Sequence, residues 1–253
     1  HTTVIVDLGT GATGRHHRAN ALLGWGCIGP DGKLYTTRTG RTGIGFQVYD
    51  PAQNAITDLA AEVETGGEVH PLVIGPDGLL YGAGSSTDNR AQIYRLDPKT
   101  GTVDMFGSVG PSHSPNPCWG YSVGADRTHV YVASGKVPWY LVAYNRETKA
   151  DAVLLTNTDP KGMINVSQGR FGCSVSYSTP ASPSNNAAYW VFEGRLIDKK
   201  TQPAPPWEEP KEVLPWVASP PRPEIAGETR PKADGQVTLW VRTPDAKAQA
   251  PAN

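Results

Sequence analysis

Four histidines that share one setting are the residues of this sequence best suited to proton transfer. His16, His17, His70 and His113 each lie a few residues before a segment that we expect to be an inner strand. An imidazole exchanges protons near neutral pH and can therefore act as an acid or a base. Guanidinium, amide and indole groups share the setting, on Arg15, Arg18, Asn116, Trp119, Gln168 and Arg170. A guanidinium binds a carboxylate through two hydrogen bonds, so the set is suited to an anionic sugar; alternatively, these are ordinary polar loop residues.

A sequence repeat is what would bring these distant segments together. The segment Ile28–Tyr35 reads IGPDGKLY, returns at 74–81 as IGPDGLLY, and returns more loosely at 123–131 as VGADRTHVY. The glycines of the three copies, Gly29, Gly75 and Gly124, are 46 and 49 residues apart. A fixed period in this range is typical of propellers and other repeat architectures.

Each repeat predicts four short antiparallel strands. In the first repeat we expect strands at 22–28, 34–37, 45–49 and 56–59, with an Asp-Gly turn joining the first two. Asp-Gly supplies the positive φ that a tight hairpin needs. Four such strands in every repeat predict an all-β fold, the β-propeller, and equal phase would place the candidate residues around one rim. A β-sandwich or barrel is the alternative, although neither requires a sustained repeat.

The number of repeats predicts an incomplete propeller. Three units are complete, and a partial fourth is expected from Gly169. The segment Val4–Gly9 resembles a closing outer strand without a blade of its own, so either it completes the last blade or the chain is a fragment or a cleaved product of a larger propeller. We therefore expect blades over 1–199, and a missing chain segment that would complete the ring.

Residues 200–253 are predicted to form a proline-rich extension. Eleven of the 23 prolines lie there, and such spacing prevents a central strand. One strand is expected, at 237–241. The extension is either a ligand for a partner domain or an excursion that packs Trp207 and Trp216 on the propeller.

Composition excludes several other classes. The net charge of −1 gives no field that would attract nucleic acid. No apolar run approaches the roughly 20 residues of a membrane-spanning helix. The three cysteines, Cys27, Cys118 and Cys173, form no metal-binding spacing, and we expect buried thiols rather than a bridge. The glycine-rich stretch 9–14 does not open a helix and is predicted to be a loop.

The quoted turn, together with Tyr49-Asp50-Pro51 and Val69-His70-Pro71, resembles bacterial seven-bladed propeller repeats over about residues 1–197. These include streptogramin lyases and the oligogalacturonate, ulvan and rhamnose–glucuronate lyases, and also NHL-type and quinoprotein-like propellers that only bind. The resemblance implies secretion or a periplasmic location, and it leaves open a divalent cation as cofactor.

Two functions follow from this resemblance. The first is a polysaccharide lyase that acts at a uronic acid, with His70 as the base, Arg170 holding the carboxylate and Tyr121 as the acid. An acidic polysaccharide or another small carbohydrate would then be bound by a further set of residues: His16, His17, His113, Trp119 and Gln168. The second is a non-catalytic scaffold that binds protein or sugar.

Overall fold

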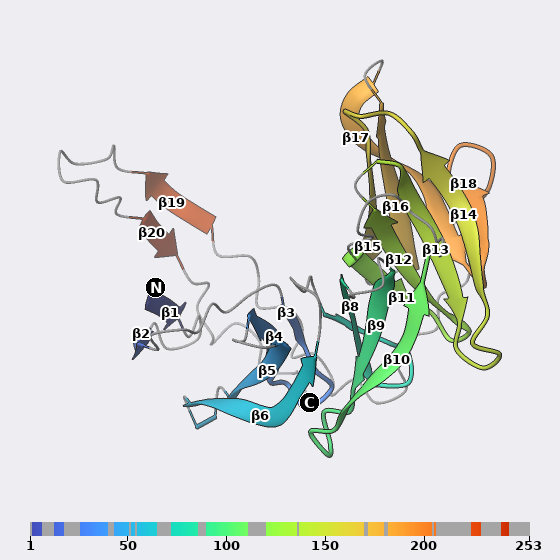
Figure 1. Ribbon diagram of the computed structural model, residues 1–253. Helices are drawn as coiled ribbons and strands as arrows, with labels where there is room; N and C mark the ends of the chain where they lie inside the picture. The colour runs from blue at the N-terminus through green and yellow to red at the C-terminus, as the bar shows by residue number, and fades with distance from the viewer. Residues whose placement is uncertain are drawn as a thin grey trace, which may run out of the picture. The chain divides into compact units, whose positions relative to one another are not determined.

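The fold was obtained as a computed structural model (Figure 1). It describes residues 2–6, 13–17, 26–39, 43–50, 52–53, 55–64, 72–85, 90–110, 120–135, 137–169, 172–179, 182–203, 205, 224–228 and 239–242. All regular elements in these ranges are strands. Within them no helix has the length and apolar character needed to cross a membrane.

Four sheets of four antiparallel strands follow one another along the chain, as the repeat predicts. In each sheet the strands pair in sequence order. The first sheet contains β3 (Gly26–Ile28), β4 (Leu34–Thr39), β5 (Gly43–Asp50) and β6 (Ala55–Glu64). The second contains β7 (Val73–Ile74), β8 (Leu80–Ser85), β9 (Ala91–Leu96) and β10 (Val103–Val109). The third contains β11 (Gly120–Ala125), β12 (His129–Gly135), β13 (Trp139–Asn145) and β14 (Asp151–Asn157), and the fourth contains β15 (Met163–Gly169), β16 (Gly172–Thr179), β17 (Ser182–Phe192) and β18 (Arg195–Asp198).

The Asp-Gly turns form as expected. Gly32 and Gly78 have φ values of 77° and 78°, the left-handed conformation that a glycine adopts without strain. In each turn the glycine N–H donates to the carbonyl of the glycine three residues earlier. The turn fixes the register of the two strands it joins, pairing Ile28 with Leu34 and Ile74 with Leu80.

The first strand of each sheet contacts the neighbouring sheets. Contacts join β3 to β7, β7 to β11 and β11 to β15. The Val166 N–H donates to Ser122 Oγ at 2.8 Å, and the Ala125 N–H donates to Gln168 Oε1 at 2.9 Å. Because residue numbers rise together in these two pairs, β11 and β15 run in the same direction. Successive meanders with their first strands side by side are the blades of a propeller.

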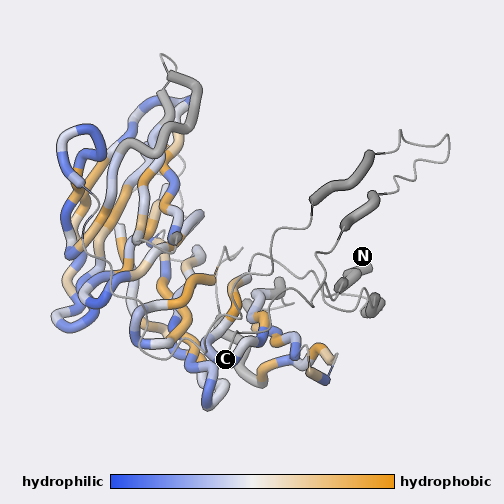
Figure 2. The backbone as a smooth tube through the Cα atoms, turned by 180° about the vertical axis from the view of Figure 1, so that it is seen from behind, coloured by the Kyte–Doolittle hydropathy of each residue, from blue (hydrophilic) through white to orange (hydrophobic). Residues whose placement is uncertain are grey.

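Apolar cores lie between consecutive sheets. One core joins the first and second sheets around Phe46 and Tyr94, the next joins the second and third around Ile93 and Val132, and the last joins the third and fourth around Leu141. Figure 2 shows the apolar residues along the strands and hydrophilic residues at the turns. Alternate residues of a strand point to opposite faces of its sheet, so each inner sheet contributes to two cores.

Close approach of the sheets depends on glycine at the start of β11. A Cβ atom on Gly120 would lie 2.5 Å from the Cβ of Ala83 in the second sheet. Glycine at this position therefore lets the second and third sheets approach each other closely. Gly172 opens β16, the second strand of its sheet, with a φ of 119°.

The prediction of an all-β, incomplete propeller is confirmed, and one detail differs. The fourth sheet has four strands and begins at Met163, because β15 is a first strand that the sequence repeat did not reveal. Among the described residues, the extensive contacts between sheets run from the first to the fourth, and none of these extensive contacts links the fourth back to the first. Cys27 and Cys173 are free thiols, and Cys173 is buried.

Two short two-stranded sheets lie outside the four blades. In one, β1 (Thr2–Val6) pairs with β2 (Thr13–His17), so Val4 belongs to a small hairpin and not to the fourth sheet. In the other, β19 (Glu224–Glu228) pairs with β20 (Leu239–Arg242), and the sequence predicted only the second of these strands. By its internal contacts the chain divides into one unit of residues 17–213 and another of 2–16 with 214–253.

Candidate functional site

The strand directions define two ends of the blades. The connection rim is the end at which β7, β11 and β15 begin, after the inter-sheet connections 65–72, 110–119 and 158–162. The hairpin rim is the end at which these strands finish. Candidate site residues can therefore be assigned to a rim by their place in a strand.

At the hairpin rim, each of the first three sheets carries an Asp–Tyr pair that joins its first hairpin. The tyrosine hydroxyl donates to the aspartate carboxylate, and that carboxylate also accepts backbone N–H groups of its own turn. The pairs are Asp31 with Tyr35 at 2.9 Å, Asp77 with Tyr81 at 2.8 Å, and Asp126 with Tyr131 at 2.5 Å. The repeated turn motif is thus a hydrogen-bonding unit as well as a turn.

Each Asp–Tyr pair also bonds to the last hairpin of the next sheet. Tyr35 donates to the Pro98 carbonyl at 3.2 Å. Arg146 donates to the Tyr81 hydroxyl at 2.7 Å and forms an ion pair with Asp77. In the third pair, the Glu193 N–H donates to Asp126 at 2.7 Å and the Gly194 N–H donates to the Tyr131 hydroxyl at 2.9 Å.

These contacts give the hairpin rim a structural role. Burial is the main cause that raises the pKa of Tyr35, Tyr81 and Tyr131 above the ordinary tyrosine value, and the neighbouring carboxylates raise it further. These phenols stay protonated and act as hydrogen-bond donors near neutral pH. The sequence showed the recurrence of Asp and Tyr, but only the structure shows that the pair joins consecutive sheets.

At the connection rim, Tyr121 stands at an irregularity of its strand. The pairing of β11 with β12 shifts register between Gly120 and Ser122, so Tyr121 lies in a bulge. Its ring is 4.8 Å from that of Trp139, at an angle of 50°, and Trp139 is 8% exposed. Bulges redirect side chains and are frequent beside active sites.

Buried hydroxyls without partners accompany this aromatic pair. Ser134, which pairs with Gly120, is fully buried, and its Oγ has no hydrogen-bond partner among the described residues. Ser85, at the connection-rim end of β8, is also buried, and its Oγ likewise has no partner among the described residues. A buried polar atom without a partner costs free energy, which a ligand or an ordered water can recover. At the connection rim the blades thus combine an aromatic pair with two buried hydroxyls.

Only one of the three connections is described over its whole length. In 158–162, the Asn157 side chain accepts from the Asp159 N–H, and the Asp159 side chain accepts from the Lys161 N–H, at 3.0 and 2.8 Å. This connection is therefore a self-bonded turn that carries one acidic and one basic residue. His70 lies in the first connection, and His113 and Trp119 lie in the second, by sequence position; all three are outside the described residues.

Gln168 and Tyr121 lie at opposite rims of the blades. Gln168 lies at the hairpin-rim end of β15, where its amide nitrogen donates to the Ile74 carbonyl while its amide oxygen accepts from Ala125. Gln168 therefore ties the ends of three first strands to one another. Arg170 follows β15 and lies outside the described residues.

The remaining sequence candidates lie in the N-terminal hairpin. His16 and His17 end β2, and their side chains are outside the description. Over the described part of the chain, no group of three or more His, Cys, Asp or Glu residues could hold a metal ion. His129 lies at the hairpin rim, where its ring stacks on that of Tyr131 with 6.1 Å between the ring centres.

Several solved structures resemble the chain at low identity. Virginiamycin B lyase from Staphylococcus aureus, in a catalytically inactive form with quinupristin, has a TM-score of 0.48 and 11% identity, over 72% of this chain and 60% of its own. Oligogalacturonate lyase from Vibrio parahaemolyticus has a TM-score of 0.45 and 12% identity, over 80% of this chain and 58% of its own. The extracellular domain of a one-component system from B. thetaiotaomicron has a TM-score of 0.41 and 15% identity, over 72% of this chain and 24% of its own. The chain thus corresponds to less than two thirds of the length of each.

Sequence comparison assigns the chain to a family without a known activity. No curated protein matches it significantly. A family profile described as a repeat of unknown function, DUF6923, matches residues 1–129, about half of the chain and the part that holds the first two repeats and the Asp126 turn. The chain therefore belongs to the DUF6923 family of repeats of unknown function.

Proposed function

We propose that the chain binds an acidic polysaccharide at the connection rim and cleaves it by elimination at a uronic acid. The observation that carries the proposal is the Tyr121–Trp139 pair, which stands in a bulge at the rim whose connections hold His70 and His113. Aromatic faces suit sugar rings, and a phenol can supply a proton. Such a substrate also favours a secreted or periplasmic location.

The proposed reaction is a β-elimination without a change of oxidation state. His70 accepts the proton from the carbon beside the uronate carboxylate. The electrons of that C–H bond form a C=C double bond as the C–O bond to the leaving sugar breaks, and Tyr121 donates a proton to the departing oxygen. Acid and base groups in these positions typically contribute about 10²- to 10⁴-fold each.

A second candidate, binding without catalysis, is favoured by the rim at which β15 ends. Arg170 directly follows β15, whose last residues lie at the hairpin rim, whereas Tyr121 is at the connection rim. Proton abstraction requires the base and the carboxylate-binding cation to be held together around one substrate. A scaffold that only binds sugar needs no such convergence.

The experiment follows the ultraviolet absorbance of unsaturated product on a panel of polyuronides, with binding to the same polymers measured by calorimetry. We expect product from the parent chain, none from His70→Ala, and a loss of about 100-fold from Tyr121→Phe, with melting temperatures near that of the parent. Tyr49→Phe, at the hairpin-rim end of β5, is the matched control and should retain activity.

The two readouts separate the candidates. Binding without product from any variant supports the scaffold, and neither binding nor product contradicts both proposals. A loss of activity in Tyr49→Phe equal to that in Tyr121→Phe would show that the effect is not specific to the connection rim.

A further inference from the structure

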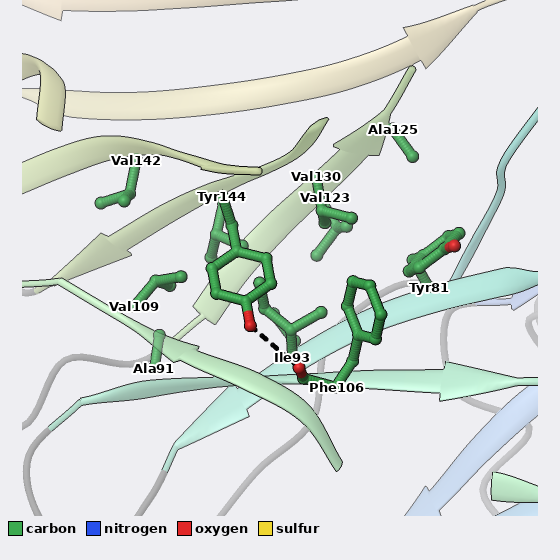
Figure 3. Close-up of a cluster of buried hydrophobic side chains, with 12 residues drawn as sticks. Tyr81, Ala91, Ile93, Phe106, Val109, Val123, Ala125, Val130, Val142 and Tyr144 are labelled. Carbon is green, nitrogen blue, oxygen red and sulfur yellow. Dashed lines mark hydrogen bonds between the residues drawn. The ribbon is translucent and has the colours of Figure 1, made fainter. Parts of the chain in front are cut away.

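Three cations gather on two aromatic rings between the second and third sheets. Phe106, labelled in Figure 3, belongs to the core between these sheets and accepts a hydrogen bond at its carbonyl from the Tyr144 hydroxyl, at 3.0 Å. The Lys149 ammonium is 3.7 Å from the centre of the Phe106 ring, and the Arg95 guanidinium is 4.7 Å from it. Arg146 lies over the Tyr81 ring at 5.1 Å.

Two of the three cations have a carboxylate partner, and the third has none. Arg95 binds Asp104 through two hydrogen bonds, of 2.7 and 3.2 Å. Arg146 forms its ion pair with Asp77. Lys149 makes no ion pair with any residue of the described chain, although its side chain lies beside these charges. The cluster therefore has one positive charge more than its carboxylates balance.

The electrostatic surroundings of Lys149 agree with this excess. Loss of hydration lowers the pKa of the Lys149 ammonium below its ordinary value, and repulsion by Arg95 and Arg146 lowers it further. Asp104 acts in the opposite direction but does not outweigh them. An added anion would reverse the repulsion, since opposite charges within a few ångströms favour the charged form.

Lys149 also occupies a position where glycine would be easier to accommodate. It has a φ of 63°, in the turn between β13 and β14, and its N–H donates to the Asn145 carbonyl. The equivalent turn of the second sheet has Gly101 there, with a φ of 70° and the same hydrogen bond, to the Asp97 carbonyl. A non-glycine residue in this region carries a conformational cost and points to a constraint beyond the turn itself.

We propose that Lys149 and Arg95, supported on the Phe106 ring, form a binding site for an anionic group with several oxygen atoms, such as a carboxylate or a sulfate ester. Lys149 contributes three donors in a compact ammonium, and Arg95 retains donors that Asp104 does not use. Arg95 lies near the end of β9 and Asp104 near the start of β10, both at the hairpin rim. The site is thus separate from the function proposed for the connection rim.

The test is an NMR titration of the lysine side chains, at low ionic strength, with two probes: sodium sulfate and trigalacturonate. We expect saturable changes at Lys149 with at least one probe and an upward shift of its pKa in the bound state. Saturation by trigalacturonate alone identifies a carboxylate ligand, and saturation by sulfate alone identifies a sulfate ligand. Signals of Tyr121 report the connection rim separately, so failure of one proposal is distinguishable from failure of the other.

The Lys149→Gly variant separates an effect on binding from an effect on folding. Lys149→Gly should reduce affinity for the probe at least 10-fold, while its melting temperature stays equal to that of the parent or rises, because glycine adopts the positive φ readily. Lys200→Gly, at an exposed turn lysine after β18, is the matched control and should retain affinity. Changes that are linear in salt and alike for all lysines, or unaltered binding by Lys149→Gly, would overturn the proposal.

Discussion

The two rims of the blades use their polar groups differently. At the hairpin rim, the Asp–Tyr pairs bond to their own turns and to the following sheet. At the connection rim, Ser85 and Ser134 keep buried hydroxyls without a partner among the described residues, near the Tyr121–Trp139 pair. Hydrogen bonds between sheets stabilise the fold, whereas a buried hydroxyl without a partner adds nothing to its stability. The comparison therefore assigns the stabilising hydrogen bonds between sheets mainly to the hairpin rim.

The largest expected effect comes from removing the most buried carboxylate of the hairpin rim. Asp126 is 1% exposed and accepts from Tyr131, from its own turn and from the fourth sheet. Asp126→Ala should cost about 3 kcal/mol of unfolding free energy, because several donors lose their partner. Urea denaturation measures this. Asp31→Ala, at an exposed turn, should cost about 1 kcal/mol; equal losses would contradict the role assigned to burial.

The next largest loss of stability is expected at Gly120, where the second and third sheets are in close contact. Gly120→Ala places a methyl group 2.5 Å from the Cβ of Ala83 and should cost about 1–3 kcal/mol by overpacking. The double variant with Ala83→Gly should recover part of the loss, since the two residues are in contact. Additive losses in thermal denaturation would show that the strain arises elsewhere.

A pH dependence is expected from His129 at the hairpin rim. Burial lowers the pKa of this imidazole below its ordinary value of about 6.5, although Asp126 and Glu193 oppose the shift. The unfolded chain therefore binds a proton more readily than the folded chain. Its contribution to stability is present above about pH 6.5 and is lost as the pH falls toward the folded-state pKa. His129→Gln should flatten this part of the stability profile; an unchanged profile would assign the slope to other groups.

The smallest effects distinguish the two kinds of serine near β11. Ser122→Ala removes the acceptor of the buried Val166 N–H and should cost about 1 kcal/mol. Ser134→Ala removes a hydroxyl that has no partner in the described part of the chain, so the unfolding free energy should stay the same or rise. Chemical denaturation of both variants provides the comparison. A larger loss for Ser134→Ala would mean that its hydroxyl is already bonded, for instance to water.

Most of the fold could be predicted from short-range signals. The Pro-Asp-Gly turns specify hairpins locally, and alternation within each strand specifies which face is buried, so the first three sheets follow from the repeat. The first strand of the fourth sheet was missed because the sequence from the end of β15 to the start of β16, Gly169-Arg170-Phe171-Gly172, lacks the aspartate and tyrosine of the other first hairpins. That omission displaced the phase assigned to Gln168 and Arg170 by one strand.

Thus the sequence alone determined the all-β repeat, the tight turns and the residue types available for chemistry, because these depend on neighbours a few residues apart. Only the tertiary structure decided which end of a blade each residue occupies and which groups remain unpaired. Gln168 shows the reason: its amide bonds to Ile74 and Ala125, 94 and 43 residues away, and such partners exist only after the sheets have packed.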